Sequence, residues 1–123
     1  QMRRRWRGER DRSDAQYNDL KQGRGTLLDI EFALQGLVLA HAARHPALLG
    51  VTSNAALLVA CRDAGLLDTA QFAMLSGAHA GLLQRSLACT LDARPRLAPR
   101  DAALEILCGE VAAVTQALGF AFD

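Results

Sequence analysis

Residues whose types could do chemistry gather in the stretch DLKQGRGTLLDIEFALQ, at positions 19–35. Glycine turns and cationic side chains bind phosphates, and paired acids hold magnesium, so the stretch resembles a nucleotide site in outline. It is therefore a candidate nucleotide-binding segment. The candidate positions are Lys21, Gly23, Arg24, Gly25, Asp29 and Glu31.

The two acids, Asp29 and Glu31, differ in what they can do. On a helix they point roughly 200° apart, whereas on a strand residues i and i+2 share a face. Helical spacing is predicted here, so the pair cannot clamp one metal, and we expect no metal site and no catalytic residue. Asp29, in the first helical turn, should be favoured by the helix dipole and cap backbone amides. Glu31, at the margin of the apolar face, is either partly buried with a partner or exposed in a cleft.

The glycine segment carries neither of the two common phosphate-binding patterns, GxGxxG and GxxxxGK[ST]. Gly23 and Gly25 nevertheless permit the backbone to approach another surface. Lys21 and Arg24 stand just before the free amides of a helix N-terminus, and that combination suits an anion. The alternative is a glycine turn with solvated cations.

The spacing of the histidines and cysteines does not match a recognisable metal or catalytic site. His41 and His45 have a spacing that zinc can use, but no third ligand is evident, so we expect surface or margin histidines. His79 occupies a predicted core-facing position. The cysteines are widely spaced in apolar helical patterns and should be small core residues: they are Cys61, Cys89 and Cys108.

Composition predicts one all-α domain. The chain has 123 residues, half of them hydrophobic but only 5% aromatic, and Ala and Leu dominate, which favours helices. No apolar run is long enough to span a bilayer and no signal peptide is evident, so a soluble, cytoplasmic protein is expected. Six arginines lie within residues 3–12, but acids are interleaved with them, so nucleic acid is an unlikely partner.

Capping and apolar periodicity predict an up-and-down bundle of four to five helices. Residues 1–25 should form a basic helix and a glycine-containing connection, and residues 26–123 the bundle. Leu107 and Val111 should be buried on the last helix. The predicted bundle helices run from Thr26 to the break at Pro46, from Thr52 or Ser53 to Ala64, from a capping box at Asp68 and Gln71 to about Leu91, and through Leu104 to Gly119.

Several segments together resemble one enzyme family, glutamine synthetase adenylyltransferase. The similarity is to the helical domain that follows each of that enzyme's two nucleotidyltransferase domains. Thr52 and Asn54 match the C-terminal copy better than the N-terminal one. The segments are the arginine run after Met2, DLKQGRG at 19–25, LDIEFALQ at 28–35, HPALL at 45–49 and AGLL at 64–67.

The resemblance implies a C-terminal helical accessory domain of a bifunctional enzyme. That enzyme moves AMP from ATP onto a tyrosine of glutamine synthetase, and its other half removes it, under control of the PII signal protein. Mg and ATP are expected for the parent enzyme, in the preceding nucleotidyltransferase domain, and not for this fragment. The resemblance further implies that the candidate positions in residues 21–31 contribute at most a cationic loop and one carboxylate to a nucleotide cleft shared with that domain. The opening Gln1-Met2 suggests a piece of a longer chain. The alternative is a stand-alone helical protein- or nucleic-acid-interaction module.

The chain departs from the family pattern at several positions. Thr26 replaces a glycine, Ser53 replaces an aspartate and Ala56 replaces an arginine. Small and apolar residues replace a charge-rich stretch of the long helix. These changes replace residues that the family uses for interactions. The spacing of apolar residues, which specifies the fold, is kept.

Overall fold

Helices dominate the protein, which is described by a computed structural model over residues 11–14 and 16–120. The basic helix expected at residues 2–12 lies almost wholly outside the described residues. The elements are β1 (Tyr17–Asp19), α2 (Leu27–His41), a 3-10 helix η1 (Pro46–Gly50), α3 (Asn54–Asp63), α4 (Thr69–Leu91), β2 (Leu97–Pro99) and α5 (Ala102–Ala117).

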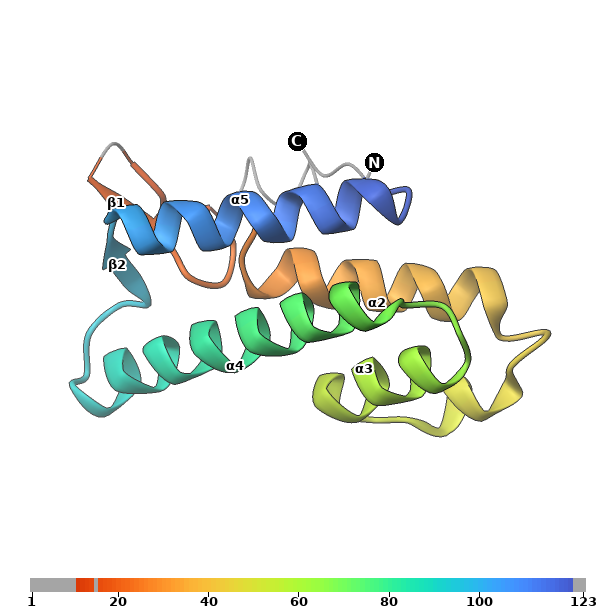
Figure 1. Cartoon of the computed structure of the whole chain (residues 1–123). Coiled ribbons are helices and arrows are strands. Elements are labelled where there is room, and N and C mark those ends of the chain that lie inside the picture. Colours follow the sequence, from red (N-terminus) through yellow and green to blue (C-terminus); the bar gives the residue numbers. More distant parts are fainter. Residues whose placement is uncertain (1–10, 15, 121–123) are drawn as a thin grey trace.

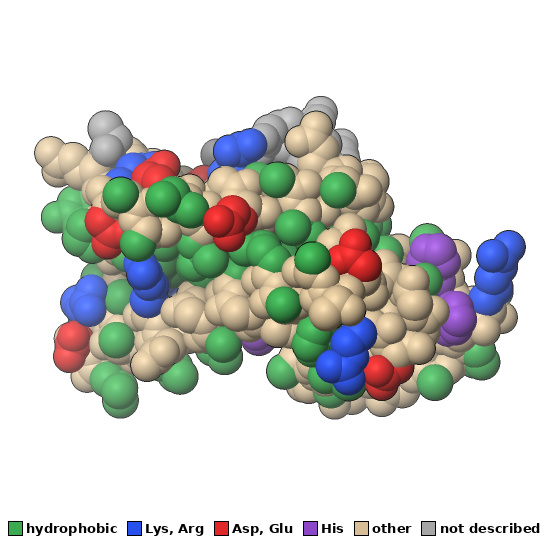
Figure 2. Space-filling view, viewed as in Figure 1, with side chains coloured by type: hydrophobic (Ala, Val, Ile, Leu, Met, Phe, Trp, Pro, Cys, Tyr) green, Lys and Arg blue, Asp and Glu red, His purple; other side chains and the backbone are tan. Residues whose placement is uncertain are grey.

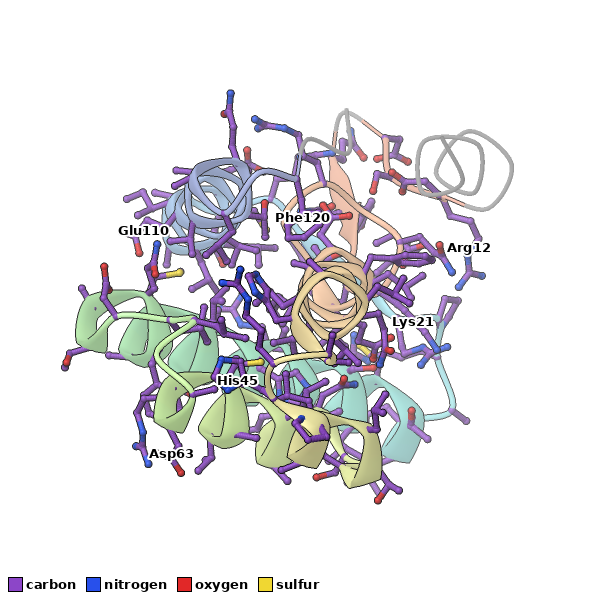
Figure 3. The ribbon with its side chains drawn as sticks, turned by 90° about the vertical axis from the view of Figure 1, so that its right-hand side faces the viewer. Arg12, Lys21, His45, Asp63, Glu110 and Phe120 are labelled. Carbon is purple, nitrogen blue, oxygen red and sulfur yellow. The ribbon has the colours of Figure 1, made fainter. Side chains whose placement is uncertain are left out.

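The four α-helices of the described region form a bundle, which confirms the predicted fold class (Figure 1). α2 and α5 lie side by side, and the antiparallel pair α3 and α4 packs across them (Figures 1 and 3). Figure 2 shows apolar side chains along the seam between α4 and α5. Within the described residues, no helix combines the length and the apolarity that crossing a membrane requires.

A short antiparallel ribbon, which the sequence did not predict, closes one end of the bundle. β1 pairs with β2 so that Tyr17 lies opposite Pro99 and Asp19 opposite Leu97. Residues 13–25 were expected to be a polar connection. Instead Asn18, Asp19 and Leu20 are all at most 2% exposed. A three-residue strand is too short to show alternating polarity, so the sequence pattern does not predict it.

A single core joins all four helices. It includes the three cysteines, whose predicted role as small core residues is confirmed. Leu20, from the turn after β1, enters the same core, so the ribbon is part of the fold rather than an appendage. The fully buried leucine and isoleucine side chains are Leu20, Ile30, Leu34, Leu58, Leu75, Leu82 and Leu104.

The predicted helix starts are largely correct. Ser53 caps α3 by accepting the Ala56 N–H at 3.1 Å. Asp68 and Gln71 form both bonds of a capping box at the start of α4. These caps satisfy amides that a helix start leaves without an intrahelical partner.

Two predictions of buried positions are wrong in detail. The buried face of α5 is formed by Leu104, Cys108, Val111 and Thr115, and Leu107 is only partly buried at its margin. The helix is turned so that Cys108 faces the segment before α2, which the apolar pattern of α5 alone does not reveal. His79 is likewise half-buried rather than a core residue.

Three helices end in the same hydrogen-bonded motif, but with different residues at the turn. At the end of α3 and of α5 the left-handed position is a glycine, Gly65 at φ +78° and Gly119 at φ +100°. At the end of α4 it is Ala93, at φ +52°. There the N–H of Arg94 donates to Cys89 O and the N–H of Ala93 to Thr90 O. The side chain of an alanine makes this conformation unfavourable.

Replacing Ala93 with glycine should therefore stabilise the protein. We expect A93G to raise the free energy of unfolding by about 1 kcal/mol, because the left-handed strain is removed. A matched control is A73G at an exposed position inside α4, which should lower it by about 1 kcal/mol. Urea unfolding measures both. An A93G protein less stable than wild type would contradict this account of the turn.

Candidate functional site

The segment that carries the predicted site is organised by one buried carboxylate, that of Asp19. Its Oδ1 accepts the backbone N–H groups of Lys21 and Gln22, each at 3.0 Å. Its Oδ2 accepts the N–H of Arg12 at 3.2 Å and lies 3.8 Å from that residue's Nε. Asp19 is 2% exposed, so these bonds offset the cost of burying its charge.

A short chain of side-chain hydrogen bonds ties this turn to α5. Ser13 Oγ accepts the N–H of Asp19 at 2.8 Å and donates to Asn18 Oδ1 at 3.1 Å. Asn18 Nδ2 then donates to the sulfur of Cys108 at 3.3 Å. The turn is thereby held against the buried face of the last helix.

The Cys108 thiol is an internal acceptor and not a nucleophile. Burial and, to a smaller extent, the nearby Glu105 carboxylate raise its pKa to about 11, although the Asn18 hydrogen bond acts in the opposite direction. Burial also raises the pKa of Cys61. Nucleophilic cysteines instead have a lowered pKa, because the thiolate is the reactive form.

The two glycines are required by close packing inside the chain. A Cβ on Gly25, at φ +72°, would lie 2.1 Å from the Cys108 carbonyl oxygen. A Cβ on Gly23 would lie 2.1 Å from Asn18 Oδ1. Both glycines therefore let the backbone approach a surface within the chain. That surface is the chain's own α5 and the Asn18 side chain.

The predicted anion site at the start of α2 is wrong in one essential part, because the first amides of the helix are not free. The N–H of Leu27 donates to Leu20 O at 3.2 Å and that of Leu28 to Lys21 O at 2.9 Å. The N–H of Asp29 donates to Thr26 O at 3.1 Å. The chain doubles back over its own helix start, so an anion would have to compete with these bonds.

Asp29 accepts a backbone amide just before the helix, as its predicted capping role requires. Its Oδ2 accepts the N–H of Gly25 at 2.7 Å, and the residue is 2% exposed. The Thr26 hydroxyl donates to Gly23 O instead of capping the helix with its oxygen. Asp29 is thus a structural residue of the turn.

The structure separates the remaining charged candidates. Arg24 is exposed and lines a cavity of about 160 Å³ that faces α5 and also contains Arg100 and Glu105. Glu31 lines a different cleft. Lys21 is half-buried beside the first turn of α2, on the same side of the molecule as Arg12 and away from Asp63 at the end of α3 (Figure 3).

Glu31 is half-buried in a cleft of about 350 Å³ between α2 and the start of α3. Of the two alternatives left open by the sequence, Glu31 matches the cleft position of one, but it is half-buried there and not exposed. Its polar lining combines two distant segments, Glu31 and Gln35 from α2 with Thr52 and Asn54 at the start of α3. Leu28 and Phe32 form its apolar part. We refer to it as the Glu31 cleft.

The two segments that line the Glu31 cleft are separated in the sequence, and no local pattern predicts that they meet. Gln35, Thr52 and Asn54 were therefore missed as site residues. Only the path of the chain through η1, which brings the start of α3 back to the middle of α2, places them beside Glu31.

Metal-ligating side chains do not converge in the described part of the chain, where no three of His, Cys, Asp and Glu are grouped. Asp29 faces the Gly25 turn, whereas Glu31 faces the cleft. His41 and His45 are half-buried near the end of α2, and Figure 2 shows histidine side chains at that end of the molecule.

A model of the protein family described as GlnD PII-uridylyltransferase matches residues 1–103. The chain belongs to this family. Curated relatives are named bifunctional glutamine synthetase adenylyltransferase/adenylyl-removing enzyme. Those of Stenotrophomonas maltophilia strains K279a and R551-3 are 50% identical over 98% of this chain and 54% identical over 91% of it. The one of Xanthomonas campestris pv. campestris strain B100 is 46% identical over 99%.

The chain spans only 12–13% of the length of these relatives. It therefore matches a small part of each enzyme. No solved structure matches the chain.

The close approach of Gly25 to α5 generates a stability prediction. G25A should lower the free energy of unfolding by about 3 kcal/mol or more, because the new methyl meets a backbone carbonyl and φ is positive. G109A is the matched control, on the helix that Gly25 touches. Nothing lies within 4 Å of a Cβ built on Gly109. G109A should therefore raise the free energy of unfolding by about 0.5–1 kcal/mol, because alanine favours a helix more than glycine does. Denaturant unfolding of the two variants would refute the packing account if they behaved alike.

Proposed function

We propose that this chain is the C-terminal helical accessory domain of a bifunctional nucleotidyltransferase that adenylylates and deadenylylates glutamine synthetase. The observation that carries the proposal is sequence identity of 50% over 98% of the chain to an enzyme of that name. The chain accounts for 13% of that enzyme's length, which fits a domain rather than the whole catalyst.

The chemistry of AMP transfer is assigned to another domain of the parent. Transfer of a nucleotidyl group from ATP requires acids that hold magnesium against the triphosphate. The described residues bring no such group together, and the amides at the start of α2 are already bonded. In this proposal ATP and magnesium bind the preceding nucleotidyltransferase domain, and this chain supplies a rigid helical surface.

The Glu31 cleft is the part of that surface best suited to meet the catalytic domain. It presents one carboxylate flanked by Gln35, Thr52 and Asn54, which offer amide and hydroxyl groups. A half-buried carboxylate of this kind can orient a cationic side chain or a hydrogen-bond donor of the neighbouring domain. Lys21, near the start of the same helix, would add positive charge at the edge of the contact.

The other candidates have supporting parts in this proposal. The path of the turn depends on Gly23, Gly25 and Asp29. Arg24 lines the separate cavity that faces α5. The partners would be glutamine synthetase and, through the parent, the PII signal protein in the cytoplasm.

A second candidate activity follows from the family description, which names a PII-uridylyltransferase. It would make the parent a transferase of UMP onto PII. The curated relatives favour adenylylation of glutamine synthetase, because high identity to enzymes of that name extends over nearly the whole chain.

Substitutions in the full-length parent enzyme test the role of the cleft. E31Q and K21A should each lower the rate of glutamine synthetase adenylylation by about tenfold or more, since charge at the catalytic contact is lost. E110Q, at an exposed position of α5, is the matched control and should keep the wild-type rate. Thermal melting of each variant accompanies the assay, and the melting temperature should not change.

Wild-type rates in both E31Q and K21A would remove these residues from the active site. A lowered rate with an equally lowered melting temperature would indicate a domain contact that acts through stability alone. Incorporation of UMP into PII, with no AMP incorporated into glutamine synthetase, would replace the adenylyltransferase assignment by the second candidate.

The chain on its own should fold without catalysing transfer. We expect the 123-residue chain to show a mainly helical circular dichroism spectrum and a cooperative thermal transition, because its four helices share one core. It should transfer no AMP from ATP to glutamine synthetase in the presence of magnesium. Detectable magnesium-dependent transfer by the chain alone would contradict the assignment of catalysis to another domain.

A further inference from the structure

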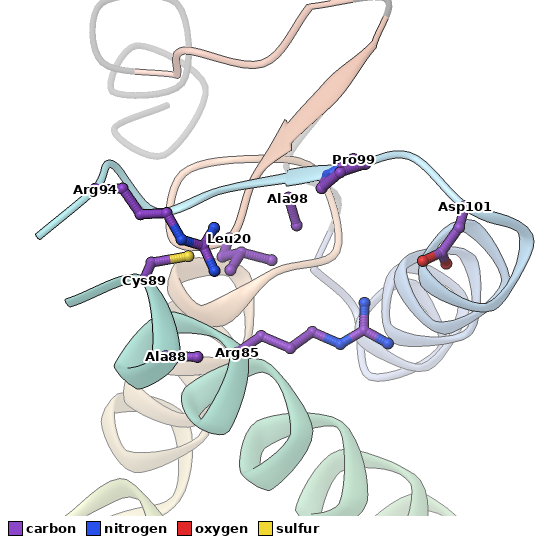
Figure 4. Close-up of a pocket in the computed structure, with 8 residues that line it drawn as sticks. All are labelled: Leu20, Arg85, Ala88, Cys89, Arg94, Ala98, Pro99 and Asp101. Atoms are coloured by element: carbon purple, nitrogen blue, oxygen red, sulfur yellow. The ribbon is translucent and has the colours of Figure 1, made fainter. Parts of the chain in front are cut away.

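We propose that a third cavity, between the C-terminal half of α4 and β2 and called here the Arg85 cavity, binds a small oxyanion of the phosphate or carboxylate class through Arg85 and Arg94. The cavity has a volume of about 220 Å³. Figure 4 shows Arg94 on one side of it and Arg85 extending along it toward Asp101. It is distinct from the Glu31 cleft, and its lining includes Leu20, Arg85, Cys89, Arg94, Ala98 and Asp101.

Arg85 is the half-buried cation of this cavity. No carboxylate forms an ion pair with it in the described part of the chain. Its surroundings are apolar, because Leu20 is 0% exposed and Cys89, one helical turn further along α4, is 2% exposed. A guanidinium that has lost part of its water without gaining an anion is under-compensated, and an oxyanion would supply the missing partner.

Arg94 is placed at the cavity by the strained end of α4. The left-handed turn at Ala93, φ +52°, lets the N–H of Arg94 bond to Cys89 O at 2.9 Å, which returns the chain over Cys89. Among the described residues Arg94 forms an ion pair with Asp92, whose Oδ2 lies 3.2 Å from Arg94 Nε, at the surface, where both side chains are about half exposed or more. Such pairs contribute little free energy, so Arg94 can exchange this contact for a ligand.

Asp101 is the one acid among the described residues that line the cavity, and it does not neutralise both arginines. Its Oδ1 accepts the N–H of Leu104 at 2.7 Å as the N-cap of α5. Apart from the surface pair of Arg94 with Asp92, the two arginines therefore share one carboxylate, and one oxygen of that carboxylate is used by the cap. In an apolar cavity with walls fixed by α4, β2 and a capped helix, charge-assisted hydrogen bonds to an oxyanion are strong.

Inorganic phosphate is the probe for the test, titrated into the 123-residue chain by isothermal calorimetry at constant ionic strength. Wild type should bind one phosphate saturably. R85Q should weaken binding by about tenfold or more, because a hydrogen bond to a charged group is lost. R85K keeps the charge but lacks the planar guanidinium group, so its affinity for phosphate should lie between those of wild type and R85Q. R44Q removes the same charge at an exposed position outside the cavity and should bind as wild type does.

Acetate and AMP, titrated in parallel, distinguish a carboxylate ligand from a phosphate ester. Circular dichroism and thermal melting establish that each variant is folded. If R85Q does not fold, R94Q tests the proposal independently, because Arg94 lies on another side of the cavity. The proposal is overturned if neither phosphate nor acetate nor AMP binds wild type saturably. It is also overturned if R44Q weakens binding as much as R85Q and R94Q do, since the effect would then be one of net charge.

Discussion

The buried carboxylate of Asp19 is the interaction on which the surrounding structure depends. It gathers the backbone N–H groups of Arg12, Lys21 and Gln22 around one side chain. This folds residues 12–25 into a compact turn, from which β1 reaches β2 and Leu20 reaches the core. An acid with so little exposure is stable only with several donors, and here the backbone supplies them.

That turn also decides which residues are left for function. Because it doubles back over the start of α2, it uses the helix amides, the two glycines and Asp29 for its own closure. The segment that most resembles a phosphate site is therefore a structural joint between α2 and α5. The polar surface left available lies further along α2, where Glu31 and Gln35 meet the start of α3.

The same joint arranges the arginines of the Arg85 cavity, which lies beside it. β2 is held in register by β1, so the segment after α4 passes over Leu20 and forms a wall of the Arg85 cavity. The alanine at the left-handed position of that segment contrasts with the glycines that end α3 and α5. Strain is thus confined to the one helix end that directs a charged side chain into a cavity.

How much the sequence could predict differs between the helices and the site. Local signals sufficed where neighbours in the chain interact: the caps at Ser53 and Asp68 and the helix ends at Gly65 and Gly119 are short-range hydrogen bonds between nearby residues. The resemblance to the adenylyltransferases could also be recognised from short sequence motifs, and high identity to such enzymes supports it. The opposed directions of Asp29 and Glu31 followed from helix geometry alone.

Tertiary structure decided everything that depends on contacts between distant segments. The ribbon of β1 and β2, the contact of Gly25 with Cys108 and the meeting of Glu31 with Asn54 each join residues that no local pattern relates. The rotation of α5 that buries Cys108 and leaves Leu107 at the margin has the same origin. By itself the sequence determined which segments are helical and which faces are apolar, because these follow from interactions within a few turns. Only packing determined which face meets which, because that choice depends on the whole core at once.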